Sequence, residues 1–210
     1  MSLAQSVIDT ALNMSSSGLS AGRSGNVSVR DGERVLITPT GMAYEDLAPT
    51  DIVSMALDGS VPPGSRKPSS EWHFHAAIYA ARSDVDAIVH THSIAATALA
   101  CLEEGIPAFH YMVAAAGGHD IRCAPYATFG TEELAKFAVE ALIDRKACLL
   151  AHHGVIACGA TLPKAYDLAV EVETLADQYG RAQALGAVSL LGPDEMKRVI
   201  ERFRHYGQQA

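Results

Sequence analysis

The sequence contains no long apolar run, no block of basic residues and no closely spaced pair of cysteines. A helix that crosses a bilayer needs about 18 or more consecutive apolar residues, so we expect no transmembrane segment. The formal net charge of −8 argues against nucleic acid or an anionic membrane as the main partner. The first residues also lack the basic start and apolar stretch of a secretory signal.

The number and spacing of the cysteines indicate the cellular compartment. The chain has four of them, and none forms a C-x-x-C pair. Scattered cysteines are typical of buried free thiols in a reducing compartment. We therefore expect a cytoplasmic protein, and an enzyme is the simplest class that fits.

What the chain does contain is enough apolar material for one well-packed core. It has 210 residues, of which 49% are hydrophobic and 19% are charged. This composition excludes disorder, and the length is that of one domain. There is no internal repeat and no linker, so we expect a single domain over residues 1–210.

Helical and strand-like patterns alternate along the chain. Helical spacing of apolar residues and capping signals predict helices over 3–16, about 70–81, 94–102, 131–143, 162–185 and 193 to about 206. Short apolar stretches predict strands at 27–29, 35–37 and 51–57, from 87 into a histidine pair, and in a strand or hairpin over 147–158. Residues 105–130 read as mainly loop. Hairpin signals among the crossovers predict a mixed sheet flanked by helices.

Three histidine-containing clusters suggest a metal site. His90 and His92 are two residues apart at the end of a predicted strand, which puts both rings on one face. Imidazole pairs of this kind suit zinc, although an H-x-H pair alone is a weak signal. Glu71 lies near a predicted helix start capped by Ser69 or Ser70, where a carboxylate often only complements the helix dipole.

The other histidines leave two questions open. His152 and His153 are adjacent in an apolar run, so only one is expected to face the site, and spacing does not say which. Glu71 and His75 are also four residues apart, as in helical zinc motifs, whereas His73 lies off that face. We interpret His73 and His75 as surface histidines or as residues behind the ligands. The hypothesis is a metal site of Glu71, His90, His92 and one of the adjacent pair.

Three turns of small residues lie near these clusters, at Gly25-Asn26, Thr40-Gly41 and Ser69-Ser70. Turns of this kind offer backbone N–H groups and hydroxyls to an anion, and the third opens a helix. Each one alone is more often just a turn or a cap. All three lead toward the predicted metal site, so together they suggest a phosphate site.

The chain resembles the class II aldolase/adducin-head family along essentially its whole length. The resemblance rests on many motifs in the family's order: GNVSVR from Gly25, LITPTG from Leu36, PSSEW from Pro68, VHTH from Val89, IPAFHYM from Ile106, AAAGG from Ala114, CAPYATFG from Cys123 and HHG from His152. It implies an α/β fold, a three-layer α/β/α sandwich around a mixed, mainly antiparallel sheet. It also implies a zinc-dependent enzyme that reversibly cleaves a ketose 1-phosphate, such as L-fuculose 1-phosphate, to dihydroxyacetone phosphate and an aldehyde such as lactaldehyde.

The resemblance further implies roles for individual residues. Zinc or another divalent ion, one per subunit, would be held by Glu71, His90, His92 and His153, and Glu71 would shuttle a proton. The family forms homotetramers with active sites between subunits, so Tyr111 would act on a neighbour's site by protonating the aldehyde oxygen. Phe129 and Tyr206 would line the aldehyde pocket. Phosphate would bind at the three turns, on Gly25, Asn26, Thr40, Gly41, Ser69 and Ser70.

Other activities occur on the scaffold that the chain resembles. Related members cleave 5-deoxyribulose or 5-methylthioribulose 1-phosphate, dehydrate a methylthioribulose phosphate or epimerise ribulose 5-phosphate. The tyrosine at 111 and the run through Phe129 favour an aldolase. A non-catalytic interaction domain of the adducin kind is disfavoured because all four ligand positions are filled.

Overall fold

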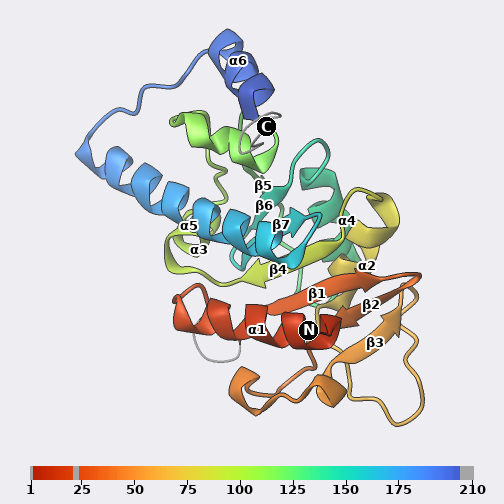
Figure 1. Cartoon of the computed structure of the whole chain (residues 1–210). Coiled ribbons are helices and arrows are strands. Elements are labelled where there is room, and N and C mark those ends of the chain that lie inside the picture. Colours follow the sequence, from red (N-terminus) through yellow and green to blue (C-terminus); the bar gives the residue numbers. More distant parts are fainter. Residues whose placement is uncertain (1, 21–23, 204–210) are drawn as a thin grey trace.

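A seven-stranded sheet forms the centre of the molecule in the computed structural model, which describes residues 2–20 and 24–203 (Figure 1). The strand order is β3-β2-β1-β4-β7-β6-β5. Every neighbouring pair is antiparallel except β5 and β6, which are parallel. The strands are β1 (Asn26–Asp31), β2 (Arg34–Ile37), β3 (Val53–Ala56), β4 (Ala87–Thr91), β5 (Arg122–Ala124), β6 (Ala147–Leu150) and β7 (Gly154–Gly159).

Helices cover both faces of the sheet and bury it in two separate apolar layers. One layer holds α1 (Leu3–Ser16), α3 (Ile94–Ala100), α5 (Leu162–Leu185) and the 3-10 helix η3 (Tyr111–Ala116), on which α6 (Pro193–Phe203) packs. The other layer holds α2 (Trp72–Ala81) and α4 (Glu132–Ala141), which lie behind the sheet in Figure 1. The predicted three-layer α/β/α sandwich with a mixed, mainly antiparallel sheet is confirmed.

Strand β4 lies in the middle of the sheet and is buried along its whole length. Its side chains alternate between the two layers, because successive residues of a strand point to opposite faces. Val89 packs in the layer of α1 and α5, and Ile88 packs in the layer of α2 and α4. His90 points with Ile88 toward α2, where its ring meets the edge of Phe74 with 5.2 Å between ring centroids.

Several element boundaries follow the sequence closely and others do not. Helices α1 and α5 have the predicted bounds, and the turn after Asp31 joins β1 to β2 as expected. The predicted strand over 51–57 is shorter, since two 3-10 turns, Tyr44–Asp46 and Pro49–Asp51, precede it. The segment 105–130 contains η3 and β5, which the loop prediction missed.

The start of α2 was predicted wrongly by one to two residues. Glu71 is the N-cap residue, just before the first turn. The hydroxyl of Ser69 accepts the N–H of Glu71 at 3.3 Å and does not reach into the helix itself. The predicted end of the last helix near 206 lies outside the described residues.

Within 2–20 and 24–203, no helix is long and apolar enough to cross a membrane.

Candidate active site

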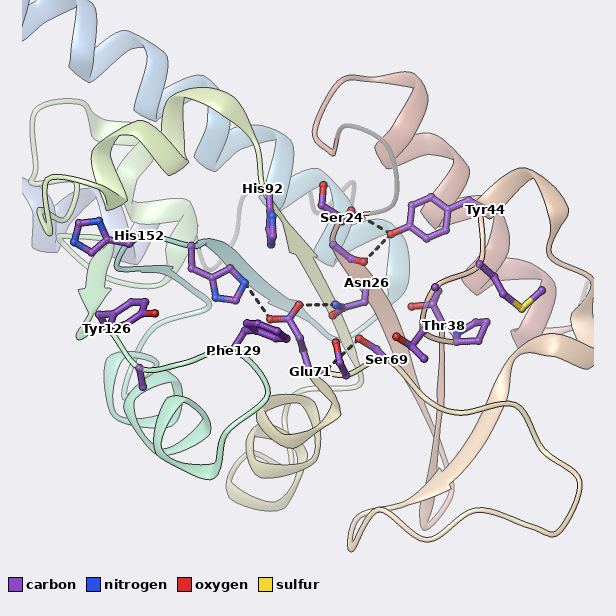
Figure 2. A pocket seen from close by; sticks show the side chains of 18 residues that line it. Ser24, Asn26, Thr38, Tyr44, Ser69, Glu71, His92, Tyr126, Phe129 and His152 are labelled. Carbon is purple, nitrogen blue, oxygen red and sulfur yellow. Dashed lines mark hydrogen bonds and ion pairs between the residues drawn. The ribbon is translucent and has the colours of Figure 1, made fainter.

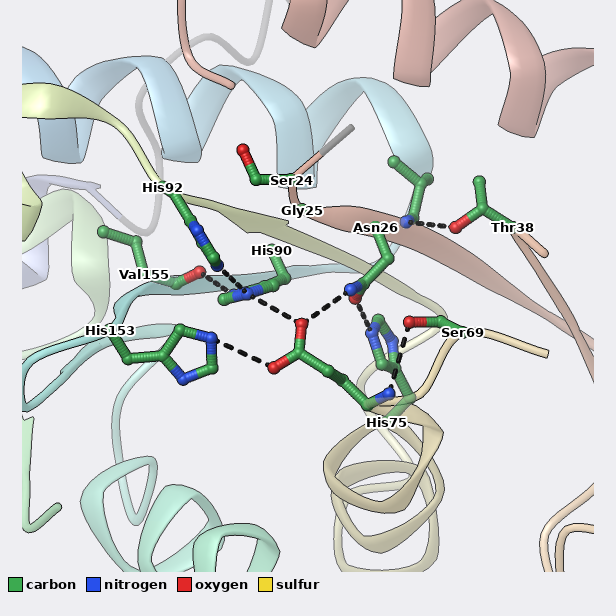
Figure 3. Close-up of polar contacts among 12 residues, drawn as sticks. Ser24, Gly25, Asn26, Thr38, Ser69, His75, His90, His92, His153 and Val155 are labelled. Atoms are coloured by element: carbon green, nitrogen blue, oxygen red, sulfur yellow. Dashed lines mark hydrogen bonds and ion pairs between the residues drawn. The ribbon is translucent and has the colours of Figure 1, made fainter. Parts of the chain in front are cut away.

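Four side chains from three separate segments meet at one point beside the sheet. Their nearest ligand atoms, from Glu71, His90, His92 and His153, all lie within 4.8 Å of one another. The Nε2 atoms of His90 and His92 are 3.0 Å apart. The two carboxylate oxygens of Glu71 lie 3.2 Å from His90 Nε2 and 3.0 Å from His153 Nε2 (Figure 3).

The local backbone explains how these rings converge. His90 belongs to β4 and His92 follows directly after it, so the period of two in the strand aims both rings at one side. The turn between β6 and β7 delivers His153, and Gly154 lets this turn approach β4. A Cβ on Gly154 would lie 2.3 Å from the carbonyl oxygen of Thr91 and 3.0 Å from the ring of His92. A side chain at position 154 would therefore push the turn that carries His153 away from His92.

A hydrogen bond fixes the orientation of the most deeply buried ring. His90 is fully buried, and its Nδ1 donates to the carbonyl oxygen of Val155 at 2.8 Å. When the ring is neutral, that bond leaves Nε2 with a lone pair directed at the cluster, the arrangement usual for histidines that hold metals. Three imidazole nitrogens and one carboxylate form a donor set suited to zinc and similar ions. The cluster is therefore compatible with a divalent metal.

Burial and charge set the protonation of two of the four groups, Glu71 and His92. Burial opposes ionisation of Glu71, but the charges and hydrogen bonds of His90 and His153 outweigh it and hold the pKa of Glu71 well below its ordinary value. Burial, followed by the nearby His90 and His153, lowers the pKa of His92 to about 4. At neutral pH Glu71 is thus a carboxylate and His92 is a neutral imidazole.

A pocket of about 340 Å³ opens beside the cluster and is lined by Glu71, His92 and His153 (Figure 2). The two turns on its polar side are tied together by backbone hydrogen bonds, from Thr40 N–H to Lys67 O and from Ser69 N–H to Thr38 O. All six residues predicted for the phosphate site line this pocket: Gly25, Asn26, Thr40, Gly41, Ser69 and Ser70.

The opposite side of the pocket is aromatic and more open. Tyr126, Phe129 and His152 line it, and Phe129 is 64% exposed. The loop that carries Phe129 lies close to the start of α2, since a Cβ on Gly130 would be 2.7 Å from the carbonyl oxygen of Ser70. The other residue predicted for the aldehyde pocket, Tyr206, lies outside the described residues.

Tyr111 does not line this pocket. It begins η3, is about half exposed, and lines a separate hollow between η3 and α6 together with residues such as Phe109 and Phe203. Among the described residues, Tyr111 and Glu71 thus line different cavities.

His152 turns away from the cluster that its neighbour joins. Its backbone is left-handed, with φ of 55°, and its Nε2 lies 3.0 Å from Glu103 Oε1 at the rim of the pocket.

His75 does not lie on the surface. One of the two readings from the sequence placed it on the surface, but it is fully buried. Its Nε2 is 2.5 Å from Asn26 Oδ1, and Asn26 Nδ2 in turn donates to Glu71 Oε2 at 3.0 Å. His73 is different, because it is only partly buried and stacks on Trp72.

Tyr44 was not found from the sequence. It is buried beside the pocket, and its hydroxyl donates to the carbonyl oxygen of Gly25 at 2.7 Å. Burial, with smaller effects from Glu71 and Glu45, raises the pKa of Tyr44 to about 12. A single tyrosine at the start of a short 3-10 turn carries no sequence signal that its hydroxyl will bind the backbone of Gly25.

The fold and this pocket define an α/β enzyme with a centre suited to a divalent metal. Comparison with known proteins agrees. Residues 5–179 match the family model described as Class II Aldolase and Adducin N-terminal domain. The chain therefore belongs to this family, and it is an aldolase, an enzyme that makes and breaks carbon–carbon bonds.

Individual relatives resemble the chain over nearly its whole length. The 5-methylthioribulose-1-phosphate/5-deoxyribulose-1-phosphate aldolase of Rhodospirillum rubrum is 54% identical, covering 100% of this chain and 95% of the relative. The L-fuculose phosphate aldolase of Escherichia coli K12 is 50% identical, covering 98% and 95%. A solved L-fuculose 1-phosphate aldolase superposes with a TM-score of 0.93 at 42% identity, covering 96% of both chains.

Proposed function

We propose that this aldolase is zinc-dependent and reversibly cleaves a ketose 1-phosphate to dihydroxyacetone phosphate and an aldehyde. The observation that carries the proposal is the single pocket in which the Glu71–histidine cluster adjoins three small-residue turns. A phosphate at the turns would leave the carbonyl of a short sugar next to the cluster. The cytoplasmic setting expected from the sequence remains a prediction.

In this proposal the polar side of the pocket binds the phosphate. Gly25, Thr40, Gly41 and Ser70 offer backbone and hydroxyl groups around one space. Ser69 Oγ accepts the N–H of Glu71, which leaves its own hydrogen to donate to a phosphate oxygen. The same serine would then connect the phosphate to the residue that handles the proton.

Glu71, His90, His92 and His153 would hold the zinc ion. When bound, zinc supplies Lewis acidity toward the carbonyl and hydroxyl oxygens of the substrate. The lowered pKa of Glu71 keeps it ionised at neutral pH, so one carboxylate oxygen can take up a proton during the reaction. In the aldol direction it would take that proton from the carbon next to the carbonyl of dihydroxyacetone phosphate, and in cleavage it would return it.

Tyr111 would complete the site from a neighbouring subunit of a homotetramer, protonating the aldehyde oxygen as the new bond forms. Its half-exposed position in a cavity separate from Glu71 supports this arrangement. On the aldehyde side, Phe129 and Tyr206 would contact the second product.

Mixed assemblies test the shared site. Glu71→Gln and Tyr111→Phe should each nearly abolish turnover, while Glu71→Gln keeps some zinc. Co-refolding equal amounts of the two variants should restore about a quarter of wild-type activity, because about one site in four then combines both native residues. Activity that stays at the level of the separate variants would place both residues in one subunit or remove Tyr111 from the reaction.

A substrate panel tests the reaction itself. Release of dihydroxyacetone phosphate should be measured from L-fuculose 1-phosphate, 5-deoxyribulose 1-phosphate and 5-methylthioribulose 1-phosphate. The last two are included as a second candidate because the 54% identical relative carries their names. Loss of water or epimerisation, in place of aldehyde release, would contradict the proposal. A zinc-free protein inert toward all three sugars would favour a non-catalytic role.

A further inference from the structure

A buried chain of polar groups runs from Glu71 into the interior between β1 and α2. Asn26 Nδ2 is 3.0 Å from Glu71 Oε2, and Asn26 Oδ1 is 2.5 Å from His75 Nε2 (Figure 3). On the far side of the ring, Ser28 Oγ is 2.7 Å from His75 Nδ1 and 2.8 Å from the hydroxyl of Tyr79. These five side chains are all buried.

The chemistry of the five groups allows only one direction for these bonds. Ionised Glu71 can only accept, so Asn26 must present its amide nitrogen to the carboxylate and its oxygen to His75. His75 Nε2 must therefore carry a hydrogen. In a neutral ring Nδ1 then accepts from the hydroxyl of Ser28, which in turn accepts from Tyr79. Burial, with a smaller effect from the nearby His90, lowers the pKa of His75 to about 3, in agreement with a neutral ring.

This direction fixes the amide of Asn26. Turning the amide over would set its oxygen against the carboxylate of Glu71 and its NH₂ against the N–H of His75, so both bonds would be lost. The backbone of Asn26 is equally constrained, because it pairs with His90 in the register of β1 and β4. Asn26 is thus held by the sheet on one side and by His75 on the other.

We propose that His75 is a positioning residue for the aldolase: through the amide of Asn26 it fixes the orientation of the Glu71 carboxylate. The proposal rests on the proposed function of Glu71 as zinc ligand and proton carrier. Imidazole suits the task because a neutral ring accepts a hydrogen bond at one nitrogen and donates one at the other. Asn26 also lines the phosphate end of the pocket, so a single amide adjoins both parts of the site.

Four variants distinguish an effect of His75 on the orientation of Glu71 from an effect on the packing of the core. His75→Leu removes both bonds of the ring, whereas His75→Gln keeps a donor that can reach Asn26. Ser28→Ala breaks the series of hydrogen bonds one bond further from Glu71. It replaces His75→Leu as the test variant if His75→Leu does not fold. Ile78→Ala is the matched control, since Ile78 is 1% exposed one turn along α2 in the same apolar layer and does not belong to the chain of hydrogen bonds.

Each variant should be assayed for kcat and KM with the preferred ketose 1-phosphate, and for zinc affinity by chelator competition without substrate. We expect His75→Leu to lower kcat and zinc affinity about 10- to 100-fold, the usual effect of losing a group that orients a ligand. KM should change less than kcat. His75→Gln should recover most of the loss, Ser28→Ala should show a smaller loss, and Ile78→Ala should lose thermal stability with both quantities near wild type.

The proposal is overturned if His75→Gln is no better than His75→Leu, or if Ile78→Ala lowers zinc affinity as much as His75→Leu. If His75→Leu does not fold, wild-type zinc affinity and kcat in Ser28→Ala also overturn it. Failure of the proposed function looks different: the wild-type protein would then release no dihydroxyacetone phosphate from any sugar of the panel. The zinc-affinity measurements alone would then decide whether His75 positions Glu71.

Discussion

The two ends of strand β6 carry polar clusters of opposite character. Before its start, Arg145 is 5% exposed and donates to Asp120 Oδ1 at 2.7 Å and to the carbonyl oxygen of Asp144 at 2.9 Å. After its end, His153 joins Glu71, His90 and His92, whose nitrogen and oxygen atoms face one another around a common point. The first cluster pairs a cation with an anion and with carbonyl oxygens. The second gathers groups that a shared cation would satisfy better than they satisfy one another.

The difference separates a structural cluster from a binding site. A buried guanidinium whose donors are met by acceptors stabilises the loops that it joins, and removing it leaves a charge without its partner. In the second cluster, burial and the neighbouring imidazoles oppose a charge on His92, so this ring gains little from its neighbours until an ion binds. Mutations in the two clusters should therefore act on different quantities.

The largest effect is expected from removing one of the converging rings. His92→Ala should lower zinc affinity at least about 100-fold and activity with it, since a four-ligand site becomes a three-ligand site. The metal-free variant should be as stable as metal-free wild type, or more stable. Metal content and thermal unfolding with and without a chelator measure both quantities. His152→Ala is the neighbouring control and should keep its zinc; equal zinc in His92→Ala would contradict the assignment.

A medium effect, on stability alone, is expected in the other cluster. Arg145→Met should destabilise the fold by about 3 kcal/mol, because it leaves Asp120 without its buried partner. Since Asp120 is partly exposed, water offsets some of the loss. Urea unfolding gives the free energy, and kcat at a temperature where the variant is folded should remain near wild type. A large drop in kcat with unchanged stability would reverse the distinction between the clusters.

The smallest effect concerns pH and the buried ring behind Glu71. Burial lowers the pKa of His75 to about 3, below its ordinary value near 6.5. Between these values the unfolded chain binds a proton that the folded chain does not, so stability falls as the pH falls through this window. From pH 7 to pH 5, metal-free wild type should lose about 2 kcal/mol more than metal-free His75→Gln.

Urea unfolding at the two pH values measures this difference. Ile78→Ala should show the same pH dependence as wild type because it keeps the ring. An identical loss in His75→Gln would mean that the folded chain protonates His75 as readily as the unfolded chain does.

The sequence predicted the architecture and most of the residues of the pocket, for reasons that are local. The period of two in a buried strand was enough to bring His90 and His92 together. The choice between His152 and His153 could not follow from alternation, since the left-handed backbone at His152 breaks the strand pattern at that residue. Strand β5 escaped prediction because it is three residues long and depends on its pairing with β6.

His75 shows a further limit of sequence patterns. Spacing of four residues suggested that it shares a helical face with Glu71, but Glu71 precedes the helix as its N-cap. What decides the role of His75 is Asn26, 49 residues away along the chain and brought near by the packing of α2 on β1. Contacts of this kind depend on the register of the sheet, which no local pattern reveals.

The loop that carries Phe129 has a practical consequence for altering the enzyme. Tyr126 and Phe129 are largely exposed, whereas Asn26, Glu71 and His90 are buried. Randomising positions 126 and 129 should diversify the accepted aldehydes at little cost to folding, provided that Gly130 is kept so that the loop still lies against Ser70. The molecule thus separates an exposed rim from a buried centre, and directed evolution can vary the first while leaving the second unchanged.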